Sequence, residues 1–204
     1  VLFSWLVMYF VAGSPVILIV CVAGLAGMGG LFAYNASEHF ARRINSFLSS
    51  EIDANTQIYF ATNAIQEGRF FGVGVGEGTV KWSLPDAHTD FIIAVAAEEY
   101  GFIMVLAIIL LYMTIVMRSL LRLVRERDPF ARIAGTGLAC AFGVQALINM
   151  GVAVRLLPAK GMTLPFVSYG GSSMIASGIA LGMLLALTRT RPQGEFAEIL
   201  RRSR

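Results

Sequence analysis

Long apolar runs constrain the fold of this 204-residue chain more than any other feature of the sequence. A helix needs about 20 mostly apolar residues to cross the hydrocarbon core of a bilayer. Four runs approach or exceed that length, and a shorter apolar run precedes them at the start of the chain. Lipid leaves no partner for unpaired backbone groups, so the runs predict helices. We therefore expect an all-α polytopic membrane protein with about four to five transmembrane helices.

Composition supports this class. Apolar residues make up 56% of the chain and charged residues only 14%, with a mean hydropathy of +0.70. Soluble domains carry about 25% charged residues, so soluble globular and disordered classes are both excluded. The formal charge of +3 gives no indication of nucleic-acid binding. The first run lacks an initiator Met and a basic segment, so it is not a signal peptide, and we interpret it as the end of a span.

The polar segments divide the chain. The predicted organisation is transmembrane helices over 1–34, the first one partial, a large outer loop over 35–90, a helix over 91–117, a cytoplasmic loop over 118–133, a helix over 134–157, an outer turn or re-entrant segment over 158–173, a helix over 174–188, and a basic tail over 189–204.

Basic residues set the orientation of the helices. Five arginines lie within 118–132 and five more follow Thr188, whereas the loop 35–90 has four basic residues against seven acids. Lys and Arg concentrate on the cytoplasmic side of membrane proteins. The two arginine-rich segments are therefore predicted to be cytoplasmic and the loop 35–90 extracytoplasmic.

The loop 35–90 is too long for a simple connector. Residues 56–67 have helical character, and the glycine-rich run 72–78 and Pro85 predict irregular structure after them. The glycine run does not match the spacing of a phosphate-binding loop, because neither GxGxxG nor GxxxxGK[ST] is present. A large ordered loop on one side of a membrane bundle is a common place for function.

Carboxylates mark the boundary between this loop and the next span. Asp90, in the run His88-Thr89-Asp90, suits a helix N-cap and also a catalytic carboxylate exposed to substrate, and the two roles are compatible. Glu98 and Glu99 are expected inside the span, where a carboxylate needs a polar cavity or a partner residue. Eight helical residues rise about 12 Å, so Asp90 and Glu98 are too far apart for a glycosidase-like pair.

Other polar residues have both a structural and a functional interpretation. Ser172 or Ser173 suits an N-cap better than a nucleophile, because the surrounding run is not GxSxG. Lys160 and Arg155 flank Pro158 at the outer end of a span. Snorkelling to the interface and contact with a lipid phosphate fit these two cations equally well.

Four motifs together resemble one family. They are LPDAHTDFI over 84–92, AEEYG over 97–101, QALIN over 145–149 and LPAKGMTLPFVSYGGSS over 157–173. These runs resemble the SEDS family (shape, elongation, division and sporulation) of polytopic cell-wall polymerases, from about residue 40 to 188. Lys160 is similar to the division branch rather than the elongation branch. The sequence departs from the family at two places. The family often carries Asp-Pro and Gly-Tyr-Gln before the loop helix, whereas residues 52–57 keep only Gln57 of this pattern. Arg155 stands where a small residue is usual.

The resemblance implies the C-terminal part of a bundle of about ten spans. It implies a peptidoglycan glycosyltransferase that polymerises lipid II and releases undecaprenyl diphosphate, with Asp90 as the catalytic carboxylate. Lys160, Arg42 and Arg43 are then candidate diphosphate contacts, and His88, Glu98 and Ser172 further candidate substrate contacts. A lipid II flippase and a non-enzymatic scaffold of the wall-synthesis complex are the alternatives.

The resemblance also implies a cellular setting. It places the protein in the bacterial plasma (inner) membrane, at the division septum for a division-type member, with a class B penicillin-binding transpeptidase and other division proteins as partners. No metal-ligand cluster of recognisable spacing is present in the sequence, and the sequence assigns no definite cofactor. A divalent cation, Mg or Mn, is compatible with the departure of a diphosphate.

Overall fold

The computed structural model describes residues 2–48, 57–158 and 161–189. The described residues form helices and irregular segments without a strand. The helices are α1 (Leu2–Val11), α2 (Val16–Ala36), α3 (Glu38–Leu48), α4 (Gln57–Gly68), the 3₁₀ turn η1 (Val80–Trp82), α5 (Ile92–Val124), α6 (Pro129–Ala153) and α7 (Gly171–Thr188).

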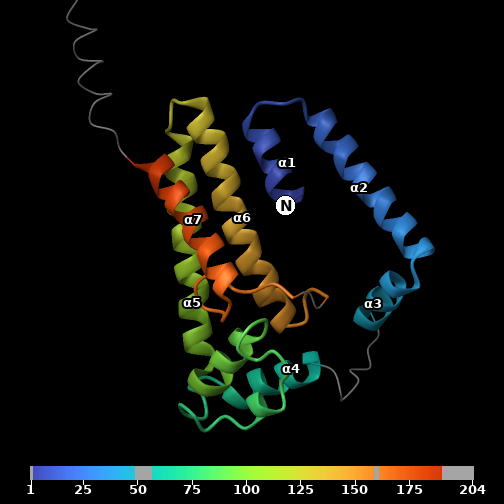
Figure 1. Cartoon of the computed structure of the whole chain (residues 1–204), viewed down its shortest axis with the longest axis vertical. Helices are drawn as coiled ribbons and strands as arrows, with labels where there is room; N and C mark the ends of the chain where they lie inside the picture. Colours follow the sequence, from blue (N-terminus) through green and yellow to red (C-terminus); the bar gives the residue numbers. More distant parts are fainter. Residues whose placement is uncertain (1, 49–56, 159–160, 190–204) are drawn as a thin grey trace, which may run out of the picture.

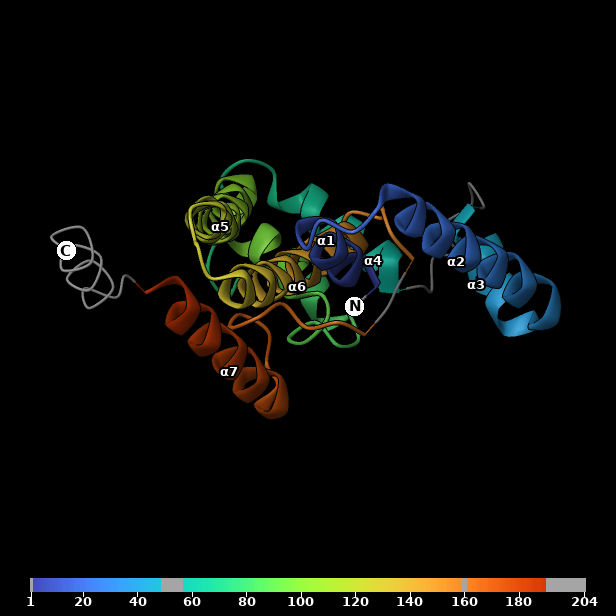
Figure 2. The same cartoon turned by 90° about the horizontal axis from the view of Figure 1, so that it is seen from above.

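The predicted all-α membrane class is confirmed. Helices α2, α5, α6 and α7 are each long and apolar enough to cross a membrane, whereas α1 has only 10 residues. Figure 1 shows α5, α6 and α7 as a bundle, with α4 and the irregular loop gathered at one end. Helix α1 lies against α6, and α2 runs away from the bundle without a buried residue (Figure 2).

Small residues bring the helices together. A Cβ atom added at Gly137 of α6 would lie 2.3 Å from the sulfur of Met8 in α1, and one at Gly143 would lie 3.0 Å from Val116 of α5. Glycine at these positions lets two helix backbones approach closely, which is a common basis of helix packing in membranes.

Helix α5 is longer than the predicted span and is not continuous. Gly101 has φ 78° and ψ −176°, so the chain turns there between residues 92–100 and residues 102–124. The second part alone is roughly 35 Å long, which suffices to cross the hydrocarbon core. Glu98 and Glu99, expected inside the span, both precede the turn at Gly101, on the short part of α5 that packs against α4 and η1.

The segment after Gly68 satisfies the backbone groups freed by this turn. The amide of Phe102 donates to the carbonyl of Arg69 at 2.9 Å, and the amide of Val73 donates to the carbonyl of Glu98 at 2.9 Å. Gly72, the first residue of the glycine-rich run, is required at this approach, because a Cβ atom there would lie 2.1 Å from the carbonyl oxygen of Glu99.

The cytoplasmic loop predicted over 118–133 is mostly helical. Helix α5 continues to Val124, and α6 begins at Pro129, where the Asp128 side chain accepts a hydrogen bond from the amide of Phe130 at 3.0 Å. Arg and Leu favour helices, so the helix continues past the end of the apolar run.

A shared apolar core attaches the segment 161–170 to the bundle. Tyr112 of α5 stacks on Phe142 of α6, with ring centroids 5.4 Å apart, and its hydroxyl donates to the carbonyl of Pro165. Leu164 is fully buried in the same cluster as Ile93. The core of the bundle therefore includes residues of the segment 161–170, which lies within the motif over 157–173.

Candidate functional site

The turn before α5 is organised around the carbonyl of Asp86. This carbonyl accepts hydrogen bonds from the amides of Thr89 and Asp90, both at 3.1 Å, and from the Thr89 hydroxyl at 3.1 Å. Asp86 has φ 55°, a conformation that Asp tolerates better than most residues. The predicted N-cap role of Asp90 is wrong, because Phe91 occupies the cap position and no side chain bonds the first turn of α5.

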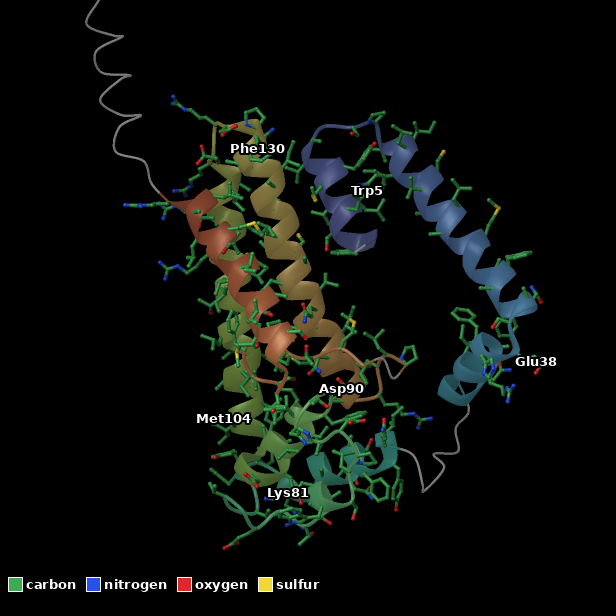
Figure 3. The ribbon with its side chains drawn as sticks, viewed as in Figure 1. Trp5, Glu38, Lys81, Asp90, Met104 and Phe130 are labelled. Carbon is green, nitrogen blue, oxygen red and sulfur yellow. The ribbon has the colours of Figure 1, made fainter. Side chains whose placement is uncertain are left out.

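The carboxylate of Asp90 is consequently not used as a cap. It is partly exposed, and among the described residues no hydrogen bond to its oxygens is found. Burial raises the pKa of this carboxyl, and the negative charge of Asp86 raises the pKa further. A carboxylate with a raised pKa is a stronger base, and partial exposure leaves it accessible to a substrate hydroxyl. Figure 3 places Asp90 at the loop end of the bundle, opposite Phe130.

The segment 161–170 bonds the backbone of the turn 86–90 through one amide and one side chain. The amide of Tyr169 donates to the carbonyl of His88 at 2.9 Å, and the Ser168 hydroxyl donates to the carbonyl of Thr89. Ser168 is buried and also accepts from the amide of Leu164 at 2.8 Å. Two distant parts of the sequence therefore form one unit around the predicted motif.

Helix α6 also bonds the backbone of this turn through a side chain. The side-chain amide of Asn149 donates to the carbonyl of Asp90 at 2.9 Å and to the carbonyl of Met162 at 2.6 Å. One helical turn earlier, the amide of Gln145 donates to the carbonyl of Thr163 at 3.0 Å. The three carbonyls of His88, Thr89 and Asp90 are thus all hydrogen-bonded.

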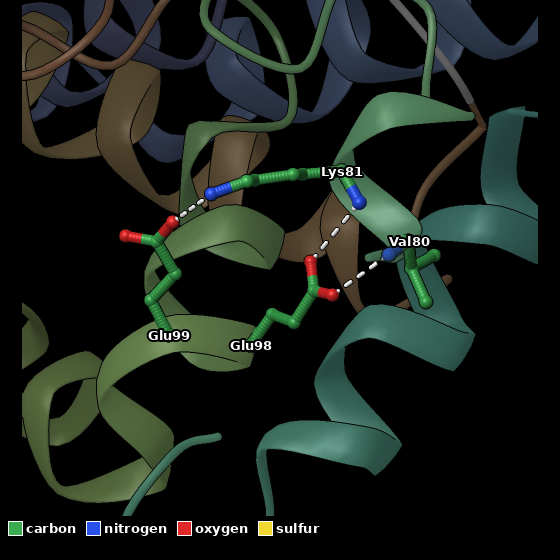
Figure 4. Close-up of polar contacts among 4 residues, drawn as sticks. All are labelled: Val80, Lys81, Glu98 and Glu99. Carbon is green, nitrogen blue, oxygen red and sulfur yellow. Dashed lines mark hydrogen bonds and ion pairs between the residues drawn. The ribbon is translucent and has the colours of Figure 1, made fainter. Parts of the chain in front are cut away.

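Glu98 and Glu99 have structural partners instead of substrate. Glu98 is 0% exposed, and its two carboxylate oxygens accept from the amides of Val80 at 2.8 Å and Lys81 at 3.0 Å. The Lys81 ammonium pairs with Glu99, as Figure 4 shows. The expectation that a partner residue neutralises one of the glutamates is met by Lys81. Glu98 as a substrate contact is wrong, because a fully buried carboxylate cannot touch a substrate.

The remaining candidates are not all near Asp90. His88 is exposed, and its ring lies edge-on to Tyr169 with centroids 5.9 Å apart. Arg42 lies on α3 and pairs with Glu38 at 3.3 Å, and Figure 3 shows Glu38 well away from Asp90. The structure thus does not bring Arg42 to the catalytic candidate. Lys160 and the side chain of Arg43 lie outside the described residues.

Ser172 lies in the first turn of α7, exposed to solvent. The predicted N-cap role of Ser172 or Ser173 is wrong, because the cap position is Gly170 and no side chain bonds the first turn. The hydroxyl of Ser173 instead bonds the hydroxyl of Thr163 at 2.6 Å, which ties α7 to the segment 161–170.

Asn149, Gln145 and Ser168 lie within motifs quoted from the sequence, but the sequence interpretation gave none of them a role in the site. Gln145 and Asn149 are four residues apart in an apolar run, so they share one helix face. Polar residues inside membrane helices are costly and commonly functional, and this spacing was the available signal. Across the described part of the chain, no group of three or more His, Cys, Asp or Glu side chains is placed to hold a metal ion.

Four helices long and apolar enough to cross a membrane, with a carboxylate-bearing turn docked between α6 and the segment 161–170, define a polytopic membrane protein. The chain belongs to the family of FtsW, RodA and SpoVE, since the family model described as "Cell cycle protein" matches residues 1–193.

Individual relatives agree with this assignment. The chain is 46% identical over 195 residues to the "Probable peptidoglycan glycosyltransferase FtsW" of Caulobacter vibrioides (strain NA1000 / CB15N), covering 92% of this chain and 50% of that protein. It is 41% identical over 193 residues to the protein of the same name in Geobacter sp. (strain M18), covering 93% of this chain and 52% of that protein. The chain therefore spans about half the length of these relatives.

A solved structure also resembles the fold. It is described as "Structural coordination of polymerization and crosslinking by a peptidoglycan synthase complex". The TM-score is 0.61 at 29% sequence identity, over 82% of this chain and 48% of the matched chain.

Proposed function

We propose that the protein to which this chain belongs is a peptidoglycan glycosyltransferase that polymerises lipid II during cell division. The names of the FtsW relatives support the reaction and the division role. Because the chain spans about half of those relatives, the proposal concerns the full-length protein.

One observation carries the proposal. Asp90 presents a partly exposed carboxylate with a raised pKa, on a turn fixed by hydrogen bonds from α6 and from the segment 161–170. General bases need this combination of fixed position, access and a pKa moved toward the working pH. Glu98 does not form a glycosidase-like pair with it, because Glu98 is buried in other contacts.

The reaction needs only one base. The 4-hydroxyl oxygen of the acceptor sugar attacks the anomeric carbon of the lipid-linked donor and forms the β-1,4 bond. The anomeric carbon–oxygen bond to diphosphate breaks, its electron pair leaves with undecaprenyl diphosphate, and Asp90 takes the hydroxyl proton. Diphosphate is a good leaving group, so positive charge nearby suffices in place of a second acid.

Lys160 and Arg43 remain our candidates for that positive charge, on the grounds of sequence alone. Arg42 is the weaker candidate, because it pairs with Glu38 on α3. Diphosphates commonly bring a divalent cation, and we assign any Mg or Mn ion to the substrate.

We further propose that the loop end of the bundle is extracytoplasmic in the bacterial inner membrane. The arginine-rich connection between α5 and α6 and the end of α7 lie at the opposite end (Figure 1), which agrees with the positive-inside rule. The resemblance to a peptidoglycan synthase complex supports a penicillin-binding transpeptidase as partner at the septum.

Purified full-length protein incubated with lipid II tests the proposal. A polymerase yields β-1,4-linked glycan strands and free undecaprenyl diphosphate in detergent, where no membrane separates two sides. A flippase yields neither product but moves fluorescent lipid II across proteoliposomes, and a scaffold does neither. Absence of strands from a preparation that still binds lipid II would contradict the proposal.

A further inference from the structure

Asn149 occupies an unusual place between the two outer segments of the site. It is 1% exposed, on α6, and its side-chain nitrogen faces the carbonyls of Asp90 and Met162. Both neighbours are acceptors, so only the amide nitrogen can face them, and its two N–H groups are both used. A single side chain therefore fixes the segment that carries the proposed base and the segment that faces this base.

The two segments meet at the carboxylate itself. A Cβ atom added at Gly161 would lie 3.2 Å from Oδ2 of Asp90, so the carboxylate rests against the backbone next to Met162. The Asn149 amide that donates to the carbonyl of Met162 also donates to the carbonyl of Asp90. A shift of either segment would change the position of the carboxylate relative to its surroundings.

We propose that Asn149 is a positioning residue for Asp90: its carboxamide locks the turn 86–90 against the segment 161–170 and so sets where the carboxylate meets the acceptor hydroxyl. The proposal rests on the proposed function of Asp90 as base. Misplacing a catalytic group by about 1 Å can lower a rate on the order of 100-fold, so a lost tether at this point affects turnover more than substrate binding.

Gln145 provides a matched comparison. It lies one turn earlier on the same helix and also donates its amide to the segment 161–170, at Thr163, but no hydrogen bond joins it to the turn 86–90 in the described structure. Gln145→Ala therefore removes one tether of the segment and leaves the link between Asp90 and Met162 intact.

Disulfide cross-linking measures the position directly. In the full-length protein with its native cysteines replaced, Cys21 and Cys140 included, the pair Asp90→Cys and Gly161→Cys is expected to oxidise, since a Cβ atom at position 161 lies 3.2 Å from the end of the Asp90 side chain, where the sulfur of a cysteine can approach it. We expect Asn149→Ala to slow cross-linking at least about fivefold, and Gln145→Ala to change the rate by less than about twofold. Asn149→Ser, whose hydroxyl is too short to bridge both carbonyls, gives the same test with a smaller change in packing.

Turnover is measured in the same backgrounds with Asp90 and Gly161 intact. Asn149→Ala is expected to lower kcat about 10- to 100-fold and to change KM less than about threefold, while Gln145→Ala, which leaves the link between Asp90 and Met162 in place, lowers kcat less than Asn149→Ala does. An unchanged cross-linking rate in Asn149→Ala and Asn149→Ser, an equal fall in Gln145→Ala, or a fall in cross-linking without loss of kcat would each overturn the proposal. Cross-linking does not depend on the chemistry, so a failure of Asp90 as base shows separately, as normal turnover in Asp90→Asn.

Discussion

Gly161 leaves the space that the Asp90 carboxylate occupies: a Cβ atom at position 161 would lie 3.2 Å from Oδ2 of Asp90. These two residues are 71 positions apart in the chain and come together only because the segment 161–170 docks on the turn before α5. The contact explains why the sequence carries a glycine directly after Lys160.

Gly161→Ala should impair catalysis more than folding. The new methyl carbon would lie 3.2 Å from Oδ2 of Asp90. At this distance the carboxylate of the proposed base must move by a few tenths of an ångström. We expect turnover to fall on the order of tenfold, with a melting temperature close to that of wild type. Gly171→Ala is the control, because a Cβ atom there meets nothing within 4 Å. Equal turnover in Gly161→Ala and wild type would contradict the assigned contact.

The pH dependence of turnover should respond to Asp86. A base must be deprotonated, so the rate falls as the pH drops through the pKa of Asp90, which burial and Asp86 raise above the ordinary value of 3.8. Asp86→Asn removes the negative charge that contributes to this rise, so the acid limb of the pH–rate profile is expected to move to lower pH. Rates measured from about pH 4 to about pH 8 decide this. An acid limb at the same pH in Asp86→Asn would contradict the contribution of Asp86 to the raised pKa of the base.

Glu98→Gln should destabilise the loop. Glu98 accepts two backbone amides in a fully buried position, and a glutamine places an N–H group against one of these donors. Lost hydrogen bonds to a charged group cost about 1.5–3 kcal/mol each, so a clear fall in melting temperature is expected. Glu77→Gln, at an exposed position in the same loop, is the control. A melting temperature equal to wild type would show that the buried contacts of Glu98 do not hold the loop.

Gly101→Ala should be more severe still. Gly101 has φ 78°, and a Cβ atom there would lie 2.4 Å from the backbone of Gly72 and of Phe70. With ψ at −176°, this conformation is open essentially to glycine alone and costs another residue about 1–3 kcal/mol, and the backbone contacts cannot yield as a flexible side chain can. Loss of folded protein on size-exclusion chromatography is the expected result. Gly178→Ala in α7 meets no atom within 4 Å and is expected to fold normally.

Hydrophobic runs were sufficient to predict the membrane class, because length and composition alone decide whether a helix can span a bilayer. The turn at Gly101 was not predictable in this way, since the apolar pattern continues through it and only the packing of residues 69–74 against it requires the break. The sequence also indicated Asp90 by its place at the boundary and by the motif around it.

Contacts between distant segments account for the rest. Asn149 lies 59 residues from Asp90, and Ser168 lies 79 residues from Thr89, so no local pattern joins them. For Glu98 the sequence interpretation assigned too much. A carboxylate in an apolar run suggested a substrate contact, whereas its oxygens accept hydrogen bonds from the backbone amides of Val80 and Lys81 in η1.

The most direct measurement is the turnover of Asp90→Asn in the full-length protein, with lipid II as substrate and rates normalised to folded protein. Burial raises the pKa of Asp90, so its ionised form at neutral pH weakens the folded state, and a neutral amide is expected to leave the melting temperature at or above that of wild type. Asp86→Asn serves as the matched carboxylate-to-amide control. A base contributes roughly 100- to 10,000-fold, so we predict a loss of that size in Asp90→Asn with unchanged lipid II binding. Glycan strands made by Asp90→Asn at the wild-type rate would contradict the assignment of Asp90 as the catalytic base.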